Sequence, residues 1–137
     1  IGDISIHGIP ASHNEMERDE NGNCKFMGYV FKLGNYTIYH SGDTLWFDEM
    51  VNILQLFSID IALLPINGNK PERKVAGNLD ASQAVKLAKT LRVKTVIPCH
   101  YDMFLFNTAD VKDFIVEAKK MDQPYCVLQL GEHYQSE

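Results

Sequence analysis

The sequence has no membrane-length apolar run and few of the residues that mark several other classes of protein. No stretch approaches the roughly 18 apolar residues of a membrane span, and nothing resembles a signal peptide. Three cysteines, an odd number without C-x-x-C spacing, indicate buried reduced thiols rather than a disulfide scaffold. The formal net charge is −5, and no basic stripe is present to bind a nucleic-acid backbone. We therefore expect a cytoplasmic protein that binds neither membranes nor nucleic acids.

Two further absences concern completeness. The chain starts at Ile1 without a methionine and runs almost directly into a strand, which we interpret as a fragment whose beginning lies elsewhere. Among the five histidines no two stand two residues apart, so the chain contains no H-x-H motif. With 137 residues and 45% apolar composition, it is still long enough to bury the core of one domain.

Three strand-like segments are each followed by a potential metal ligand. His13 follows the segment 4–10, Asp43 follows 36–41, and His100 follows 93–97. Side chains held at strand ends are rigidly placed, as metal chemistry requires. Two imidazoles and a carboxylate that can bridge two ions suit Zn²⁺, Mn²⁺ or Fe. The pattern predicts that the three side chains converge on one edge of a sheet; the alternative is three unrelated surface or core residues.

The remaining patterns predict a mixed α+β chain. The expected order is strand, hairpin, helix, strand, helix, strand, helix, strand, with parallel neighbours in the second half. Asp80 and Gln83 form a capping pair at the start of the clearest helix. The expected segments are an exposed loop at 14–23, hairpin strands at 26–33 and 36–41 joined by Gly34-Asn35, helices at 48–57, 80–92 and 109–121, and strands at 60–65 and 125–130.

Several short segments together carry a family resemblance. The most specific are Ser41-Gly42-Asp43-Thr44 and Pro98-Cys99-His100-Tyr101-Asp102-Met103-Phe104, supported by Ala11-Ser12-His13, Pro65-Ile66-Asn67-Gly68, Gly77-Asn78-Leu79, Phe106-Asn107 and Gly131-Glu132. With these segments the chain resembles the C-terminal half of the metallo-β-lactamase superfamily, and within it the L-ascorbate-6-phosphate lactonase-like hydrolases. The resemblance implies that residues 1–137 form half of a four-layer αββα sandwich, a mixed sheet with helices on its outer face. The N-terminal half, with its H-x-H-x-D-H motif, is absent from this sequence.

The resemblance also implies a dinuclear site. In it His13 ligates one ion, His100 ligates the other, and Asp43 bridges both, so that Asp43 and His100 are catalytic. The complete protein would hold two divalent ions, Zn or Mn, which activate a water for hydrolysis. This chain would carry about half of that site, and we expect it to pack on its missing N-terminal half or to form a homo-oligomer.

Five residues are candidates for binding a small anionic substrate. Lys70 and Arg73 bring positive charge to a loop after a buried strand, although a solvated charged loop is the alternative. Asn67 and Asn78 lie inside the family-like segments. Tyr101 could donate a hydrogen bond to a developing oxyanion, or it could simply cap its loop.

The leading hypothesis is a metal-dependent hydrolase of a small anionic ester or lactone, such as a sugar-phosphate lactone. One alternative is a non-catalytic fragment or binding module of the same fold, because the upstream ligands are missing. Another is a nucleic-acid-processing member of the superfamily, against which the acidic balance counts. We further expect His40 to be a hydrogen-bonded structural histidine, and residues 103–106 to form core or oligomer contacts.

Overall fold

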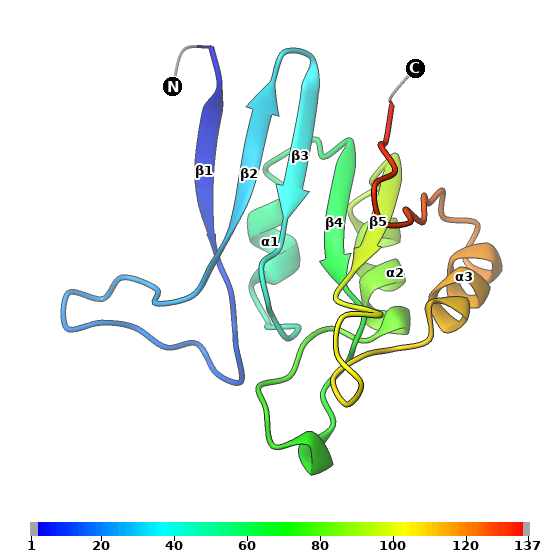
Figure 1. Cartoon of the computed structure of the whole chain (residues 1–137). Helices are drawn as coiled ribbons and strands as arrows, with labels where there is room; N and C mark the ends of the chain where they lie inside the picture. The colour runs from blue at the N-terminus through cyan, green and yellow to red at the C-terminus, as the bar shows by residue number, and fades with distance from the viewer. Residues whose placement is uncertain (1–2, 136–137) are drawn as a thin grey trace.

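The computed structural model describes residues 3–135 and contains a mixed five-stranded sheet (Figure 1). The strands lie side by side in chain order and are β1 (Ser5–Pro10), β2 (Met27–Leu33), β3 (Tyr36–His40), β4 (Ile61–Pro65) and β5 (Thr95–Cys99). The pairs β1–β2 and β2–β3 are antiparallel, whereas β3–β4 and β4–β5 are parallel. The predicted α+β class and the parallel second half of the sheet are confirmed.

The tight hairpin between β2 and β3 is also confirmed. Leu33 pairs with Tyr36 across Gly34-Asn35, and Gly34 has a φ of +57°, which suits a two-residue hairpin turn. At the other end of this pair, a Cβ on Gly28 would lie 2.4 Å from the carbonyl oxygen of Ser41. A glycine at this position of β2 therefore lets the backbone that leaves β3 lie directly against β2.

Three helices cover one face of the sheet. They are α1 (Met50–Leu54), α2 (Ala81–Thr90) and α3 (Val111–Lys120), and a short 3₁₀ turn, η1, spans Pro71–Arg73. Figure 1 shows α1 and α2 behind the strands and α3 beside α2. The predicted capping box is present, because the Asp80 carboxylate accepts from Gln83 N and the Gln83 side chain accepts from Asp80 N. The core between these helices and the sheet includes the fully buried side chains of Tyr39, Leu64, Leu87, Val96 and Phe114.

The last predicted strand, at 125–130, is wrong. Tyr125 forms an isolated parallel bridge with Val96, and the segment has no further strand pairing. Beyond it, the Leu128 carbonyl accepts from the Tyr101 hydroxyl at 3.0 Å, and the Gln129 N–H donates to the Glu132 carboxylate at 2.8 Å. Side chains therefore form hydrogen bonds with the backbone groups that a sixth strand would need for pairing with its neighbour. The helix expected at 48–57 exists but is shorter.

The face of the sheet opposite the helices carries exposed apolar side chains on β1 and β2. Met27, Tyr29 and Leu33 alternate along one face of β2 and are 40%, 42% and 51% exposed. Ile6 of β1 pairs with Phe31 on the same face and is 48% exposed. Within residues 3–135 no helix lies over this face (Figure 1), and none is both long and apolar enough to cross a membrane.

Candidate metal centre

One edge of the sheet gathers the carboxyl ends of four strands. Because β2 is antiparallel to both β1 and β3, and β3 to β5 are parallel, β1, β3, β4 and β5 all point the same way. The loops that follow these strands begin at Ala11, Ser41, Ile66 and His100. In open sheets of parallel strands this edge is where ligands bind. The backbone thus gives His13, Asp43, Asn67 and His100 positions along a single edge.

Hydrogen bonds tie these loops to one another. Ser12 N donates to Thr44 Oγ1 at 2.9 Å, and Leu79 N donates to the Thr44 carbonyl at 2.8 Å. On the other side, Ile66 N donates to the Cys99 carbonyl at 3.1 Å. These bonds fix the residues next to His13, Asp43 and His100, so the edge is a defined surface rather than four independent loops.

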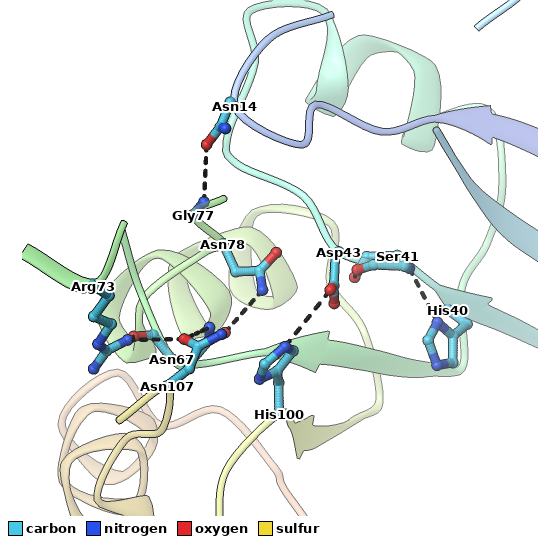
Figure 2. Close-up of polar contacts among 11 residues, drawn as sticks. Asn14, His40, Ser41, Asp43, Asn67, Arg73, Gly77, Asn78, His100 and Asn107 are labelled. Atoms are coloured by element: carbon cyan, nitrogen blue, oxygen red, sulfur yellow. Dashed lines mark hydrogen bonds and ion pairs between the residues drawn. The ribbon is translucent and has the colours of Figure 1, made fainter. Parts of the chain in front are cut away.

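Asp43 and His100 meet at this edge (Figure 2). His100 Nε2 lies 3.6 Å from Asp43 Oδ2, with the His100 side chain 15% exposed and that of Asp43 46% exposed. His100 has a φ of +62°, in the left-handed region that a non-glycine residue adopts at a cost of about 1 kcal/mol or more. Its Nδ1 is buried and has no hydrogen-bond partner in the part of the chain that the structure describes. The fold therefore holds the imidazole of His100, a residue with a strained backbone, against a carboxylate that solvent can reach.

The donor atoms of this pair are of the type that binds a divalent ion. A neutral imidazole nitrogen and a carboxylate oxygen are donors that Zn²⁺ and Mn²⁺ bind in proteins, so His100 and Asp43 would hold such an ion. Across residues 3–135, however, no three His, Cys, Asp or Glu side chains form a group that could hold a metal ion. The described residues thus supply part of a coordination shell.

His13 is not brought into contact with the other two predicted ligands. It is half-buried, its ring packs edge-on against Phe26 with centroids 5.2 Å apart, and its backbone forms a bridge with Glu15. Within the described chain no hydrogen bond or ion pair joins it to Asp43 or His100. Its role as a ligand stays a prediction, supported by its place at the same edge.

Cys99 directly precedes His100, but its thiol has low reactivity. Burial, together with the negative charge of Asp43, raises the pKa of its thiol to about 12. The thiol therefore stays protonated near neutral pH and is a poor nucleophile. All three cysteines are free, as predicted, but they are half-buried rather than buried.

The predicted substrate-binding residues Asn67, Arg73 and Asn78 belong to one hydrogen-bonded chain (Figure 2). Asn78 Nδ2 donates to Asn67 Oδ1 at 3.0 Å, and Asn67 Nδ2 donates to Asn107 Oδ1 at 2.8 Å. Arg73 Nη1 donates to Asn107 Oδ1 at 3.2 Å and to the Asn67 carbonyl at 2.6 Å, and its Nη2 donates to the Thr108 carbonyl at 2.6 Å. The guanidinium is thus engaged with protein oxygens. Sequence reasoning gave Asn107 no role, and its place in the family-like Phe106-Asn107 segment was the one available signal.

The other predicted contacts are placed differently. Lys70 is exposed, and the Tyr101 hydroxyl donates to the Leu128 carbonyl at 3.0 Å. In this arrangement the Tyr101 hydroxyl is therefore already used within the protein. His40 is the structural histidine that we expected, since its Nδ1 accepts from Gly42 N at 3.0 Å. Residues 103–106 are 50% to 103% exposed, so the predicted core contacts are wrong, because these side chains face solvent, and the predicted oligomer contacts stay a prediction.

Comparison with known proteins agrees with this architecture. A family model described as a β-lactamase superfamily domain matches residues 1–101, so the chain belongs to the metallo-β-lactamase superfamily. Two relatives are UPF0173 metal-dependent hydrolases. That of Archaeoglobus fulgidus is 34% identical over 140 residues, covering 98% of this chain and 58% of the relative. That of Nanoarchaeum equitans is 41% identical over 105 residues, covering 77% of this chain and 45% of the relative.

Solved structures with similar folds also match nearly all of this chain but only about half of their own length. Igni18, a metallo hydrolase from Ignicoccus hospitalis, superposes with a TM-score of 0.71 at 30% identity, covering 94% of this chain and 51% of Igni18. An isothiocyanate hydrolase from Delia radicum gut bacteria has a TM-score of 0.75 at 20% identity, covering 94% of this chain and 52% of that protein, and shows the fold alone. The chain therefore spans about half the length of the relatives that it matches.

Proposed function

We propose that this chain is part of a metal-dependent hydrolase whose centre lies at the carboxyl edge of the sheet. The single observation that supports it is the contact of His100 Nε2 with Asp43 Oδ2 at 3.6 Å, built from two loops about 57 residues apart in sequence. The names of the relatives, metal-dependent hydrolases, agree with this proposal. The active centre would hold two divalent ions, Zn or Mn, with further ligands from outside this chain and from His13.

In this proposal each residue of the pair has a separate task. His100 would bind a metal ion through Nε2, and its loop keeps the imidazole in place. Asp43 would contribute a carboxylate that faces solvent and can bind two metal ions. Bound metal ions supply a water of lowered pKa and polarise the substrate carbonyl or phosphoryl oxygen. Asp43, being 46% exposed, is also placed to take up a proton as the reaction proceeds.

The proposed substrate is a small anionic ester or lactone, with L-ascorbate-6-phosphate lactonase-like chemistry as the narrower form. Exposed Lys70 supports an anionic group at the loop after β4. At the same edge Asn78 has a free carboxamide oxygen, and Asn67 would act by holding the Asn78 amide in place. Tyr101 would join them only if a ligand drew its hydroxyl away from Leu128.

A non-catalytic binding module of the same fold is the second candidate. It is favoured by the incomplete ligand set, since residues 3–135 bring together two of the three predicted ligands. A nucleic-acid-processing role receives no support from the acidic charge of −5.

The test is Asp43→Ala in the complete protein. We expect hydrolysis of lactones and esters to be abolished while the fold is retained, because mutual repulsion of the ions is no longer offset without the carboxylate. Metal analysis of the intact protein should find about two ions, which the two-ion site requires. The matched control is Asp48→Ala, an exposed carboxylate farther along the same segment. Near-normal turnover in Asp43→Ala would remove Asp43 from the mechanism, and a metal-free intact protein would favour the binding module.

A further inference from the structure

The Asn78 side chain ends in a buried oxygen that lacks a partner. Asn78 is 1% exposed, and its Oδ1 accepts no hydrogen bond from any residue between 3 and 135. A buried amide oxygen left unpaired costs about 1–3 kcal/mol, and each such group in a native protein calls for an explanation. The other end of the same amide is satisfied, since Nδ2 donates to Asn67 Oδ1.

Arg73 determines which end of Asn78 is left free. A guanidinium can only donate, so the Asn107 atom facing Arg73 Nη1 must be the oxygen. Asn67 must then turn its Nδ2 toward Asn107 Oδ1, which leaves its Oδ1 to accept from Asn78 Nδ2. Reversing any one amide would place two donors or two acceptors against each other. The orientation of three carboxamides is thus set by one cation, and it leaves an acceptor, not a donor, at the end of the chain.

The free oxygen belongs to the same sheet edge as the Asp43–His100 pair. Leu79, the residue after Asn78, donates its N–H to the Thr44 carbonyl next to Asp43 at 2.8 Å. Figure 2 shows the Asn78 side chain between the Asn67–Asn107 pair and Asp43, with its oxygen turned away from Asn67. The acceptor therefore belongs to the same end of the sheet as the proposed centre.

We propose that Asn78 Oδ1 accepts a hydrogen bond from a hydroxyl or N–H group at the proposed centre, and that Arg73 acts as a positioning residue through Asn107 and Asn67. The donor belongs either to the substrate or to a bound water. This inference rests on the proposed hydrolase function, and where the donor belongs to the substrate it narrows the substrate class to an ester or lactone that carries a donor group. It also changes the proposed role of Arg73, from binding an anion directly to orienting the Asn78 side chain.

The first test is a crystal structure of the complete protein. We expect a water molecule about 2.7–3.2 Å from Asn78 Oδ1, or an open pocket facing it. A protein N–H from the remainder of the molecule bonded to this oxygen would overturn the proposal, because Asn78 would then be a purely structural residue. This test does not depend on any hydrolytic activity.

The second test compares three probes: α-hydroxy-γ-butyrolactone, its α-methoxy analogue and γ-butyrolactone. If the donor comes from the substrate, the wild type should hydrolyse the hydroxy lactone with a kcat/KM about tenfold above that of the methoxy analogue. Asn78→Ala should remove this preference, whereas Asn69→Ala, an exposed asparagine of the same region, should keep it. If water is the donor, Asn78→Ala should lower kcat/KM equally for all three probes.

Arg73 is tested by the same ratio. Arg73→Met should reduce the hydroxy-to-methoxy preference, and Arg73→Lys, which can still donate to Asn107, should restore part of it. If the substrate is the donor, a merely structural role of Arg73 would lower the rates for all probes alike and leave the hydroxy-to-methoxy ratio unchanged. If water is the donor, Arg73→Met should displace the water from Asn78 Oδ1 in a crystal structure of the variant, whereas a merely structural role would leave that water in place. If kcat/KM is unaffected by Asn78→Ala for every probe, the proposal is wrong. If the wild type hydrolyses none of the probes, these uncharged lactones are not its substrates, and the crystal structure alone decides the role of Asn78.

Discussion

At the residue scale, two buried oxygens lack partners among residues 3–135, and their surroundings differ. Asn78 Oδ1 lies at the polar edge of the sheet, whereas the Tyr39 hydroxyl lies in the core, where Tyr39 is 0% exposed. Burial raises the pKa of the Tyr39 hydroxyl far above its ordinary value of 10.0, so it stays neutral. The two oxygens therefore differ in their neighbours rather than in their burial, since polar side chains surround Asn78 and the hydrophobic core surrounds Tyr39.

Tyr39→Phe should therefore leave stability unchanged or raise it by about 1 kcal/mol, because an unpaired polar group is replaced by an apolar ring of the same shape. Tyr101→Phe is the matched comparison and should lower stability by about 1 kcal/mol, since it removes the bond to the Leu128 carbonyl. Urea unfolding of both variants measures the difference. Destabilisation by Tyr39→Phe would show that the hydroxyl has a partner after all.

Asp60 links stability to pH at the opposite end of the sheet. Burial raises the pKa of its carboxyl, but the bonds from Lys94 Nζ at 2.7 Å and from Thr37 N at 2.8 Å outweigh burial and hold the pKa below 3.8. A carboxyl with a lowered folded-state pKa contributes stability above its unfolded pKa and loses it as pH falls through the folded value.

We therefore expect the wild type to be stabilised by Asp60 at pH 7 and to lose that contribution below a pH of about 4. Asp60→Asn should be less stable at pH 7, and its stability should fall less steeply over the acid range. Urea unfolding at several pH values measures this, with the exposed Asp48→Asn as control. Parallel acid profiles for wild type and Asp60→Asn would contradict the assignment.

At the element scale, helix α2 shows how local sequence sets a boundary. Asp80 and Gln83 satisfy each other's backbone N–H groups, at 2.8 Å and 3.0 Å, and the buried side chains of Ala84, Leu87 and Ala88 dock the helix on the sheet. Just before the helix, Asn78 N donates to the Gly68 carbonyl at 3.2 Å and Leu79 N donates to the Thr44 carbonyl at 2.8 Å, so the segment that enters the helix is tied to the site.

Asp80→Ala should lower stability by about 1 kcal/mol, because the cap acceptor is lost. Asp80→Asn, which keeps a side-chain oxygen for Gln83 N, should recover most of it. Thermal unfolding of the two variants provides the comparison. Equal loss in both would indicate that the negative charge at the helix start, rather than the cap bond, carries the effect.

At the scale of the whole molecule, no helix among residues 3–135 covers the face formed by β1 and β2 (Figure 1). Apolar side chains there are 40% to 51% exposed, and monomeric proteins rarely leave large contiguous apolar patches open to water. In the sandwich that the family resemblance implies, this face packs on a second apolar sheet. The chain spans about half the length of the relatives that it matches.

Light scattering on the isolated 137-residue chain should therefore show association, or its unfolding should lack a cooperative transition. Leu33→Lys combined with Ile6→Lys should reduce association, because both charges would enter the exposed face. The exposed Leu56→Lys, which lies just beyond α1 on the helix side, is the matched control. A monomer with a sharp melt would favour a self-sufficient two-layer domain instead.

The sequence by itself determined the elements with a local physical signal. Alternation and β-branched residues predicted the strands, Gly34-Asn35 predicted the hairpin, and the Asp80–Gln83 pair predicted the start of α2. The same local logic failed at 125–130, because whether an apolar segment becomes a strand depends on which groups take its backbone hydrogen bonds, here Tyr101 and Glu132. Strand pairing is a non-local property that composition does not encode.

Tertiary structure alone decided which candidates meet. The sequence marked His13, Asp43 and His100 equally as residues after strands, and strand order and direction place all three at one edge. Loop packing then brings Asp43 to His100 at 3.6 Å and packs the His13 ring on Phe26. It marked Arg73 as a free cation, whereas the fold surrounds its guanidinium with oxygens of Asn67, Asn107 and Thr108. A side chain's chemistry can be read locally, but its partners are chosen by packing between loops distant in sequence, because hydrogen bonds and ion pairs act only over a few ångströms.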